Sequence, residues 1–392
     1  MKLANGWHLA YCTNIHRGES WAQTFQTLRD YTLRVRDNVC PKDQPYAIGL
    51  RLGATAALEL SQPETLDNFQ HWLDANNCYV FTINGFPYGT FHGARVKEDV
   101  YRPDWTTRER VDYTKLLFRL LSRLCPADSG GSVSTVPCSY KEFIQNENQV
   151  QLMKYNLWEM VDFLDELSRE SGKDLHLGLE PEPLCYLETS TEMVDFINAM
   201  REDRPGDERI NQFLGVNYDT CHLAIEFENP VDVLKRFTDN HIRISKIHLS
   251  SALKLKPTPE RLEALRAFDD PVYFHQVIIN RPGQDNLIRI RDLNDALDLA
   301  SKKPVSPDEE WRIHFHIPLH SPTNELFTST SDHISGLLDA LTGARQACQH
   351  FEMETYTWEV LPDSIKSRDV VDQLTLEYQW TLDQLKQRGF SQ

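Results

Sequence analysis

The stretch LHLGLEPEP, residues 175–183, decides the fold, because a short apolar run there ends at the carboxylate of Glu180. The run is short and ends in proline-rich sequence, which predicts a β-strand followed directly by a loop. The same arrangement returns in three later stretches: FLGVNYDTCH (213–222, with Asp219), IRISKIHL (242–249, with His248) and FEMET (351–355, with Glu354). If the four strands are parallel members of one barrel, their ends meet on one face, where catalytic groups collect.

Further strand-like runs precede this series and alternate with helical patterns. The earlier runs are WHLAYC (7–12), YAIGLRL (46–52), YVFTING (79–85) and SVSTVP (132–137). Between the runs lie amphipathic stretches such as 20–37 and 149–170, with apolar residues at near-helical spacing. Eight strand–helix units predict an α/β protein, a single (β/α)8 TIM barrel that occupies residues 1–392.

The interval between the seventh and eighth predicted strands is unusually long. It contains PVYFHQVIIN and NLIRIRDL on either side of the turn-forming RPGQD, which predicts a β-hairpin. No flexible linker bounds residues 251–345, so we interpret them as an insertion over the barrel mouth and not as a separate domain. A hairpin that only pads the outside of the barrel is the alternative.

Composition narrows the functional classes. The chain has 392 residues and a formal net charge of −17, which argues against a general binder of nucleic acid. No apolar run reaches the roughly 18 residues that cross a bilayer, and the N-terminal sequence is too polar for a secretory signal, so no membrane insertion is expected. The eight cysteines form no CxxC pairs, which indicates buried, reduced thiols in a cytoplasmic protein.

The four polar strand ends form a plausible cage for a divalent metal ion. Carboxylates with one imidazole suit Mn²⁺, Zn²⁺, Mg²⁺ or Co²⁺. We therefore predict that Glu180, Asp219, His248 and Glu354 bind one ion. Glu180 and Glu354 would also act as the catalytic acid/base pair, because a carboxylate beside a chelated hydroxy-carbonyl compound can move a carbon-bound proton. Glu182 and Glu359 are the competing choices.

Other histidines fall near the same face. His222 follows Asp219 by three residues and is a candidate second ligand or substrate contact. Of the pair in HFH (314–316), we expect one histidine, His316 in preference, to enter the mouth and support a second metal. His16 and His92 follow the first and third predicted strands and are further candidates for a second metal or for substrate binding.

These motifs resemble the xylose-isomerase-like barrel superfamily, which includes sugar isomerases, ketose 3-epimerases and multi-zinc endonucleases. LEP (179–181), DTCH (219–222), His248 and Glu354 match its usual metal positions. The resemblance implies that the two glutamates both hold the ion and move the proton. The stretch HLSSALKLK, residues 248–256, departs from the epimerase-like pattern because it lacks the arginine that those relatives place after the histidine.

Longer stretches are similar to metabolite traffic proteins of the EboE type. They include GWHLAYCTNIHRGESW (6–21), LGLEPEPLCYLE (177–188), WRIHFHIPLH (311–320) and METYTWEVLP (353–362). This resemblance implies a sugar-like or secondary metabolite as the ligand and other ebo-pathway proteins as partners, but it supplies no reaction. Three classes stay open: a metal-dependent sugar isomerase or epimerase, which we prefer, a multi-metal phosphoester hydrolase, and a noncatalytic metabolite-binding protein.

Overall fold

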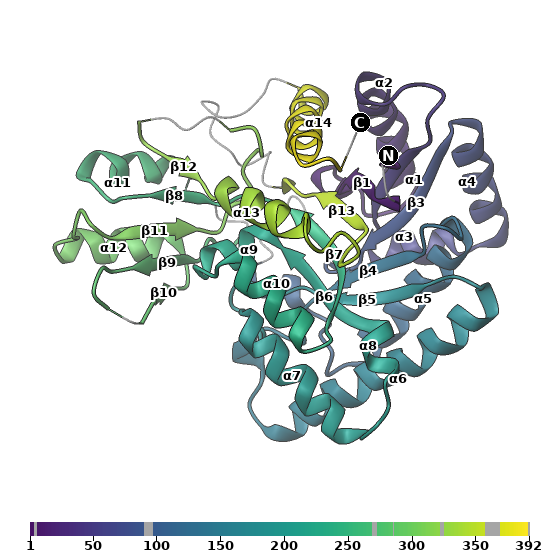
Figure 1. Ribbon diagram of the computed structural model, residues 1–392, viewed down its shortest axis with the longest axis horizontal. Helices are drawn as coiled ribbons and strands as arrows, with labels where there is room; N and C mark the ends of the chain where they lie inside the picture. The colour runs from purple at the N-terminus through teal and green to yellow at the C-terminus, as the bar shows by residue number, and fades with distance from the viewer. Residues whose placement is uncertain are drawn as a thin grey trace.

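The computed structural model describes residues 1–3, 6–89, 97–268, 273–284, 286–321, 325–356 and 369–390. Eight strands form one barrel sheet in the spatial order β1, β13, β7, β6, β5, β4, β3, β2, and neighbours in this order are parallel (Figure 1). The strands are β1 (His8–Tyr11), β2 (Tyr46–Arg51), β3 (Cys78–Asn84), β4 (Gly131–Thr135), β5 (Leu175–Leu179), β6 (Leu214–Asp219), β7 (Arg243–Leu249) and β13 (His350–Met353). The predicted TIM barrel is confirmed, and each predicted strand overlaps one of these.

The barrel closes between β1 and β2, where Cys12 forms a parallel bridge with Gly49. A Cβ atom at position 49 would lie 2.7 Å from the carbonyl oxygen of Tyr11 and 2.0 Å from a carboxylate oxygen of Glu352. Both distances are shorter than real Cβ contacts, so only glycine lets the two strands meet while Glu352 occupies the interior.

Inward-facing side chains alternate along each strand and stack in layers inside the barrel. On the β13 face they are His350, Glu352 and then Glu354, just beyond the strand. In the register of neighbouring strands, Glu352 lies beside His248, and His248 lies beside Asp219. The interior is therefore polar from a histidine layer, through a charged layer, to a carboxylate layer at the carboxyl ends of the strands.

Helices cover the outside of this barrel (Figure 1). They are α1 (Trp21–Thr27), α2 (Leu33–Val39), α3 (Ala54–Leu60), α4 (Pro63–Ala75), α5 (Arg108–Leu124), α6 (Glu147–Ser171), α7 (Ser190–Asp203), α8 (Arg209–Phe213), α9 (Thr220–Ile225), α10 (Pro230–Asp239), α13 (Ser331–Leu341) and α14 (Val370–Gln387). The longest, α6, begins at Asn146, whose side chain accepts a hydrogen bond from the Gln149 N–H, and ends at Gly172 with a φ of +67°. Its apolar stripe faces the barrel: Met153, Leu157, Met160, Val161 and Leu164.

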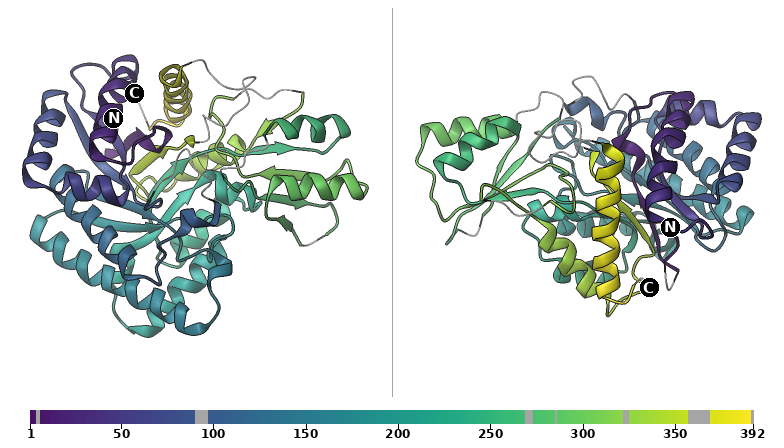
Figure 2. Two further views of the ribbon diagram at one scale, coloured as in Figure 1. Left: turned by 180° about the vertical axis from the view of Figure 1, so that it is seen from behind. Right: turned by 90° about the horizontal axis from the view of Figure 1, so that it is seen from above.

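A second sheet lies in the chain between β7 and β13. Its strand order is β10, β9, β11, β8, β12, with antiparallel neighbours. Its elements are β8 (Leu253–Leu255), α11 (Pro259–Leu265), β9 (Val277–Asn280), β10 (Ile288–Ile290), α12 (Leu293–Lys302), β11 (Glu310–Ile313) and β12 (Thr328–Ser329). The sheet and helices share a separate apolar core that includes Leu265, Leu297 and Trp311. In Figure 2 this lobe extends from one side of the barrel in both views.

The structure refines the expected insertion. β9 and β10 pair as the predicted hairpin, with Ile288 opposite Ile279. The predicted range 251–345 also includes α13, which packs against α10 and so belongs to the helical layer of the barrel. The loop after β11 carries His314 and His316. The insertion therefore delivers two histidines to the region of the polar strand ends.

Two further expectations concern the chain as a whole. Among the described segments, no helix combines the length and apolar character needed to cross a membrane. All eight cysteines are buried and unpaired, as their spacing predicted.

At the amino end of the barrel, three histidines pack in the interior without charge. His350 is held by two hydrogen bonds of 2.8 Å: its Nε2 donates to the carbonyl oxygen of Ser129, and its Nδ1 is bonded to Ser132 Oγ. Burial lowers the pKa of His350 to about 4 and that of His8 to about 3. It also lowers the pKa of His176 well below its ordinary value.

The histidine layer predicts that acid destabilises the fold. The pKa of His350 is about 4 in the folded chain and 6.5 when exposed, so between these values the unfolded chain binds more protons and stability falls as the pH drops. This group alone costs about 2 kcal/mol at pH 5. His350→Gln should therefore lose less stability between pH 7 and pH 5 than the wild type, measured by urea unfolding. The exposed His71→Gln is the control, and equal pH dependence in both variants would contradict the assignment.

Candidate metal centre

Glu180, Asp219, His248 and Glu354 converge at the carboxyl ends of the barrel strands. One donor atom from each lies within 4.8 Å of the others, and all four side chains are buried. His248 Nδ1 is 3.0 Å from Glu180 Oε1, 3.0 Å from Glu354 Oε2 and 3.6 Å from Asp219 Oδ2. Because β5, β6, β7 and β13 are consecutive neighbours in the barrel, the order of the motifs in the sequence becomes proximity in space.

The ring of His248 is oriented by a buried charge pair that sequence reasoning missed. One carboxylate oxygen of Glu352, Oε2, accepts hydrogen bonds from Lys246 Nζ at 2.6 Å and from His248 Nε2 at 2.8 Å. All three side chains are fully buried. Burial alone would raise the pKa of Glu352, but Lys246 and His248 outweigh it and lower that pKa to about 2. With Nε2 held by Glu352, Nδ1 faces the other carboxylates, as in metal sites where a carboxylate orients a ligating histidine.

Glu354 is held by two amides from other parts of the barrel. Its Oε1 accepts hydrogen bonds from Asn14 Nδ2 at 2.7 Å and from Asn84 Nδ2 at 3.0 Å, while Oε2 faces His248. Burial raises the pKa of Glu354, but the charge of His248 and its hydrogen bond dominate and lower that pKa below its ordinary value. Glu354 is therefore an ionised carboxylate with a fixed orientation.

The remaining carboxylate oxygens fit a bound cation. Asp219 Oδ1 is satisfied by the Cys221 N–H, the His222 N–H and Ser250 Oγ. In contrast, Asp219 Oδ2 and Glu180 Oε2 are buried and accept no hydrogen bond. Unpartnered buried carboxylate oxygens are costly, and a divalent ion among them would remove that cost. Three carboxylates and one imidazole nitrogen suit Mn²⁺, Zn²⁺, Mg²⁺ or Co²⁺.

A second group of donors surrounds His222. Its Nε2 lies 3.1 Å from His316 Nε2 and 3.4 Å from Glu182 Oε2. Atoms bound tetrahedrally to one ion at about 2.0–2.2 Å lie roughly 3.3–3.5 Å apart, so these distances resemble those of a shared ligand shell. His314 also belongs to the group, since its donor atom lies within 4.8 Å of those of Glu182 and His222, and its buried Nε2 makes no hydrogen bond.

Both histidines of the HFH stretch reach this group. The ring centroid of His222 is 4.9 Å from that of His314 and 5.2 Å from that of His316. One of the pair was expected to enter the mouth; both lie beside His222, because residues two apart in extended chain share a face, and His314 lines the pocket. Burial lowers the pKa of His222 and lowers that of His314 well below its ordinary value, so His314 is a neutral imidazole.

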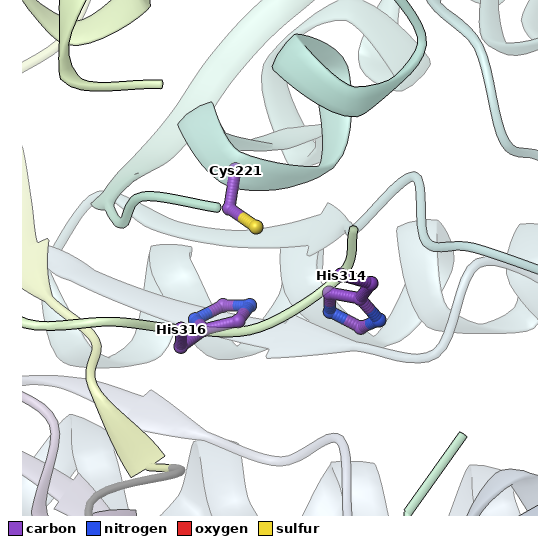
Figure 3. Close-up of side chains that lie close together, drawn as sticks. All are labelled: Cys221, His314 and His316. Atoms are coloured by element: carbon purple, nitrogen blue, oxygen red, sulfur yellow. The ribbon is translucent and has the colours of Figure 1, made fainter. Parts of the chain in front are cut away.

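Cys221 also lies beside the two histidines (Figure 3). Its Sγ is 3.4 Å from the carbonyl oxygen of Phe315, to which the thiol donates. Burial raises the pKa of this thiol well above its ordinary value, and the neighbouring Asp219 raises it further. Cys221, His314 and His316 each offer one donor atom within 4.8 Å of the others, so the thiol is a further donor beside the second group.

A pocket opens onto both groups of donors. Glu180, Glu182, His222, His314 and Glu354 line it, with Asn14 and Asn84 beside them. His16 is described by the structure but does not line this pocket. Its Nε2 is hydrogen-bonded to Tyr11 Oη at 2.9 Å, and its ring stacks on that of Tyr31 at a centroid distance of 4.8 Å. His92 and Glu359 lie outside the described residues.

Comparison with known proteins places the fold. Neither a protein-family model nor a curated protein matches the chain. Among solved structures, a D-tagatose 3-epimerase-like protein aligns with a TM-score of 0.52 and 12% identity, covering 97% of this chain and 98% of that chain. The IolI protein with a bound zinc atom aligns with a TM-score of 0.51 and 12% identity, covering 97% of this chain and 99% of that chain. A xylose isomerase-like TIM barrel protein from Mycobacterium smegmatis in complex with magnesium aligns with a TM-score of 0.51 and 13% identity, covering 99% of both chains. The chain therefore has the fold of the xylose-isomerase-like barrels.

The first prediction from the site concerns metal content. Glu180→Gln, Asp219→Asn, His248→Ala and Glu354→Gln should each lower the bound Mn²⁺ or Zn²⁺ by about one equivalent, because each removes one donor from the same cage. Mass spectrometry of protein dialysed against the metal measures this. Glu309→Gln, which changes a buried carboxylate of the insertion bonded to Arg281, is the control. Wild-type metal content in all four variants would reject the site.

The second prediction concerns Glu352 as a positioning residue. The double variant Lys246→Met/Glu352→Gln removes both buried charges together and leaves an amide beside His248. Its metal affinity should fall by about 10- to 100-fold, because the histidine loses the carboxylate that fixes its tautomer. Titration with Mn²⁺ gives the affinity, and ¹⁵N spectra of the His248 ring report the tautomer. A purely structural role would instead leave both the affinity and the ring signal of the folded variant unchanged.

Proposed function

We propose that this protein is a metal-dependent isomerase or epimerase that acts on a sugar-like or hydroxy-carbonyl metabolite. The observation that carries the proposal is that Glu180 and Glu354 line one pocket and approach the same nitrogen of His248, each at 3.0 Å. A divalent ion held by these residues with Asp219 would chelate adjacent hydroxyl and carbonyl oxygens and stabilise the negative charge formed when the neighbouring C–H proton leaves.

The surroundings of the two glutamates assign their roles in proton transfer. With Glu180 Oε1, which lies beside His248, on the ion, Oε2 is buried, accepts no hydrogen bond and would take the proton from the substrate. Glu354 Oε1 is held by Asn14 and Asn84, which fix the second carboxylate as a ligand and partner in returning the proton. The fold supports this class of chemistry, since an L-ribulose 3-epimerase also aligns with the chain, with a TM-score of 0.51 and 12% identity.

A multi-metal phosphoester hydrolase is the second candidate, and a specific observation favours it. The donors around His222 lie beside the first group and share Asp219 with it, an arrangement that suits two neighbouring ions. Two equivalents of Zn²⁺ per chain, together with hydrolysis of bis-(p-nitrophenyl) phosphate that His222→Ala abolishes, would favour this reaction over proton transfer. One equivalent and no hydrolysis would favour the isomerase.

The sequence resemblance to EboE-type metabolite traffic proteins supplies the cellular context of the proposal. We place the protein in an ebo-type pathway, acting on a sugar-like or secondary metabolite and associating with other proteins of that pathway. Eight free, buried thiols are compatible with a reducing cytoplasm. A noncatalytic role in holding the metabolite would use the same pocket without proton exchange.

Solvent-deuterium incorporation tests the proposed reaction. The metal-loaded protein should exchange a carbon-bound proton of candidate ketoses and related hydroxy ketones, detected by mass spectrometry. Glu180→Gln and Glu354→Gln should each slow exchange by about 100- to 10,000-fold, the usual contribution of a general acid or base. Metal content is measured in parallel, so that lost binding is not mistaken for lost proton transfer. Exchange at the wild-type rate in both variants, with Glu309→Gln as the control, would reject these roles.

A further inference from the structure

Besides the carboxylates and histidines, the pocket has apolar and aromatic walls. Phe86, Val100 and Tyr101 line it from the barrel, and Tyr273 and Phe274 line it from the insertion. Phe86, Tyr101 and Tyr273 are themselves at least nine-tenths buried, so their packing is fixed by the surrounding fold. A wall of this kind takes apolar surface out of water when a ligand binds.

The aromatic wall is continuous with the metal-binding end of the pocket. The ring of Tyr356 lies 4.6 Å from that of His316 and 5.6 Å from that of Tyr273. Across the pocket, the ring of Phe86 lies 6.0 Å from that of Tyr101, whose hydroxyl donates to the carbonyl oxygen of Pro183 at 3.3 Å. One ligand can therefore touch the donor groups and the aromatic rings at the same time.

The charges of the pocket disfavour a phosphorylated ligand. Among the lining residues that the structure describes, Lys97 is the only lysine or arginine. Its Nζ lies 2.6 Å from Asp292 Oδ2 and 4.8 Å from the ring centroid of Phe274, so its charge is already paired. A phosphate group on the part of the ligand that meets these walls would therefore find no unpaired lysine or arginine among the described lining residues.

We propose that the substrate carries its hydroxy-carbonyl head on an uncharged apolar or aromatic body. The head reaches Glu180 and Glu354, while the body lies against Phe86, Val100 and Phe274. A free ketose fits less well, because it bears a hydroxyl group on most carbons and would bury several of them against walls that offer few partners. The assignment of the head to the carboxylate end rests on the proposed function; the preference for an apolar body rests on the walls alone.

Two compounds with the same head test this preference. 2-Hydroxyacetophenone and 1,3-dihydroxyacetone share a hydroxymethyl ketone, and only the first adds a phenyl ring. Calorimetric titration of the Mn²⁺-loaded protein should give a Kd about 30-fold or more lower for 2-hydroxyacetophenone, because the ring is buried against the wall. Phe274→Ala and Val100→Asn should reduce this ratio while leaving the binding of dihydroxyacetone unchanged within about 3-fold. The exposed Tyr155→Ala on α6 is the matched aromatic control.

Deuterium exchange on the same two compounds separates this inference from the proposed reaction. Tighter binding of the aryl compound that depends on Phe274, without exchange, would support the inference and reject the isomerase. Exchange on dihydroxyacetone, bound as tightly as the aryl compound or more tightly, would overturn the inference and leave the reaction standing. Failure of both compounds to bind would also overturn it.

Discussion

The polar interior of this barrel depends on one buried salt bridge, between Lys246 and Glu352. Lys246 and Glu352 have no exposed surface, and a charge pair so deep depends on close geometry and on further hydrogen bonds to its partners. Glu352 uses the same oxygen for His248, so the ring that faces Glu180 and Glu354 is fixed by a charge one layer deeper in the barrel. Gly49 makes this possible, because any side chain there would collide with the Glu352 carboxylate. Barrel closure, the buried charges and the candidate metal centre therefore depend on one another.

The insertion has two roles: its apolar residues form a lobe, and its polar residues contribute to the site at the barrel. Its apolar residues form a separate core with α11 and α12, so the lobe holds its own shape. Its polar residues lie next to the barrel. There His275 Nδ1 donates to the carbonyl oxygen of His314 at 2.8 Å, and the His275 ring stacks on that of Phe315 with a centroid distance of 3.7 Å. The loop after β11 is thereby held so that the neighbouring histidines face His222. The barrel supplies the carboxylates, His222 and His248, and the insertion adds His314, His316 and part of the aromatic wall.

The sequence was sufficient for the fold and for the four convergent residues because both follow from periodicity. Short apolar runs that end in Glu180, Asp219, His248 and Glu354 need only the rule that parallel strand ends share a face. Glu352 and Lys246 could not be found this way, since a charged residue within a strand normally indicates an exposed face. The signal was present in the alternation of His350, Glu352 and Glu354, which places all three on the inward side.

The remaining features depended on the path of the insertion, which periodicity does not specify. β9 was predicted as half of a hairpin, yet it lies inside its sheet between β10 and β11, a position that only the three-dimensional pairing reveals.

Glu182, two residues beyond Glu180, was considered a competitor for the same role, whereas it faces His222 in the second group. Burial raises the pKa of Glu182 well above its ordinary value, and Glu180, Asp219 and Glu354 raise it further. The two groups therefore differ in chemistry as well as in position. The first is rich in carboxylate oxygen, which favours Mg²⁺ or Mn²⁺, and the second is rich in imidazole, which favours Zn²⁺. We therefore expect Mg²⁺ or Mn²⁺ to fill the first group and Zn²⁺ to fill the second.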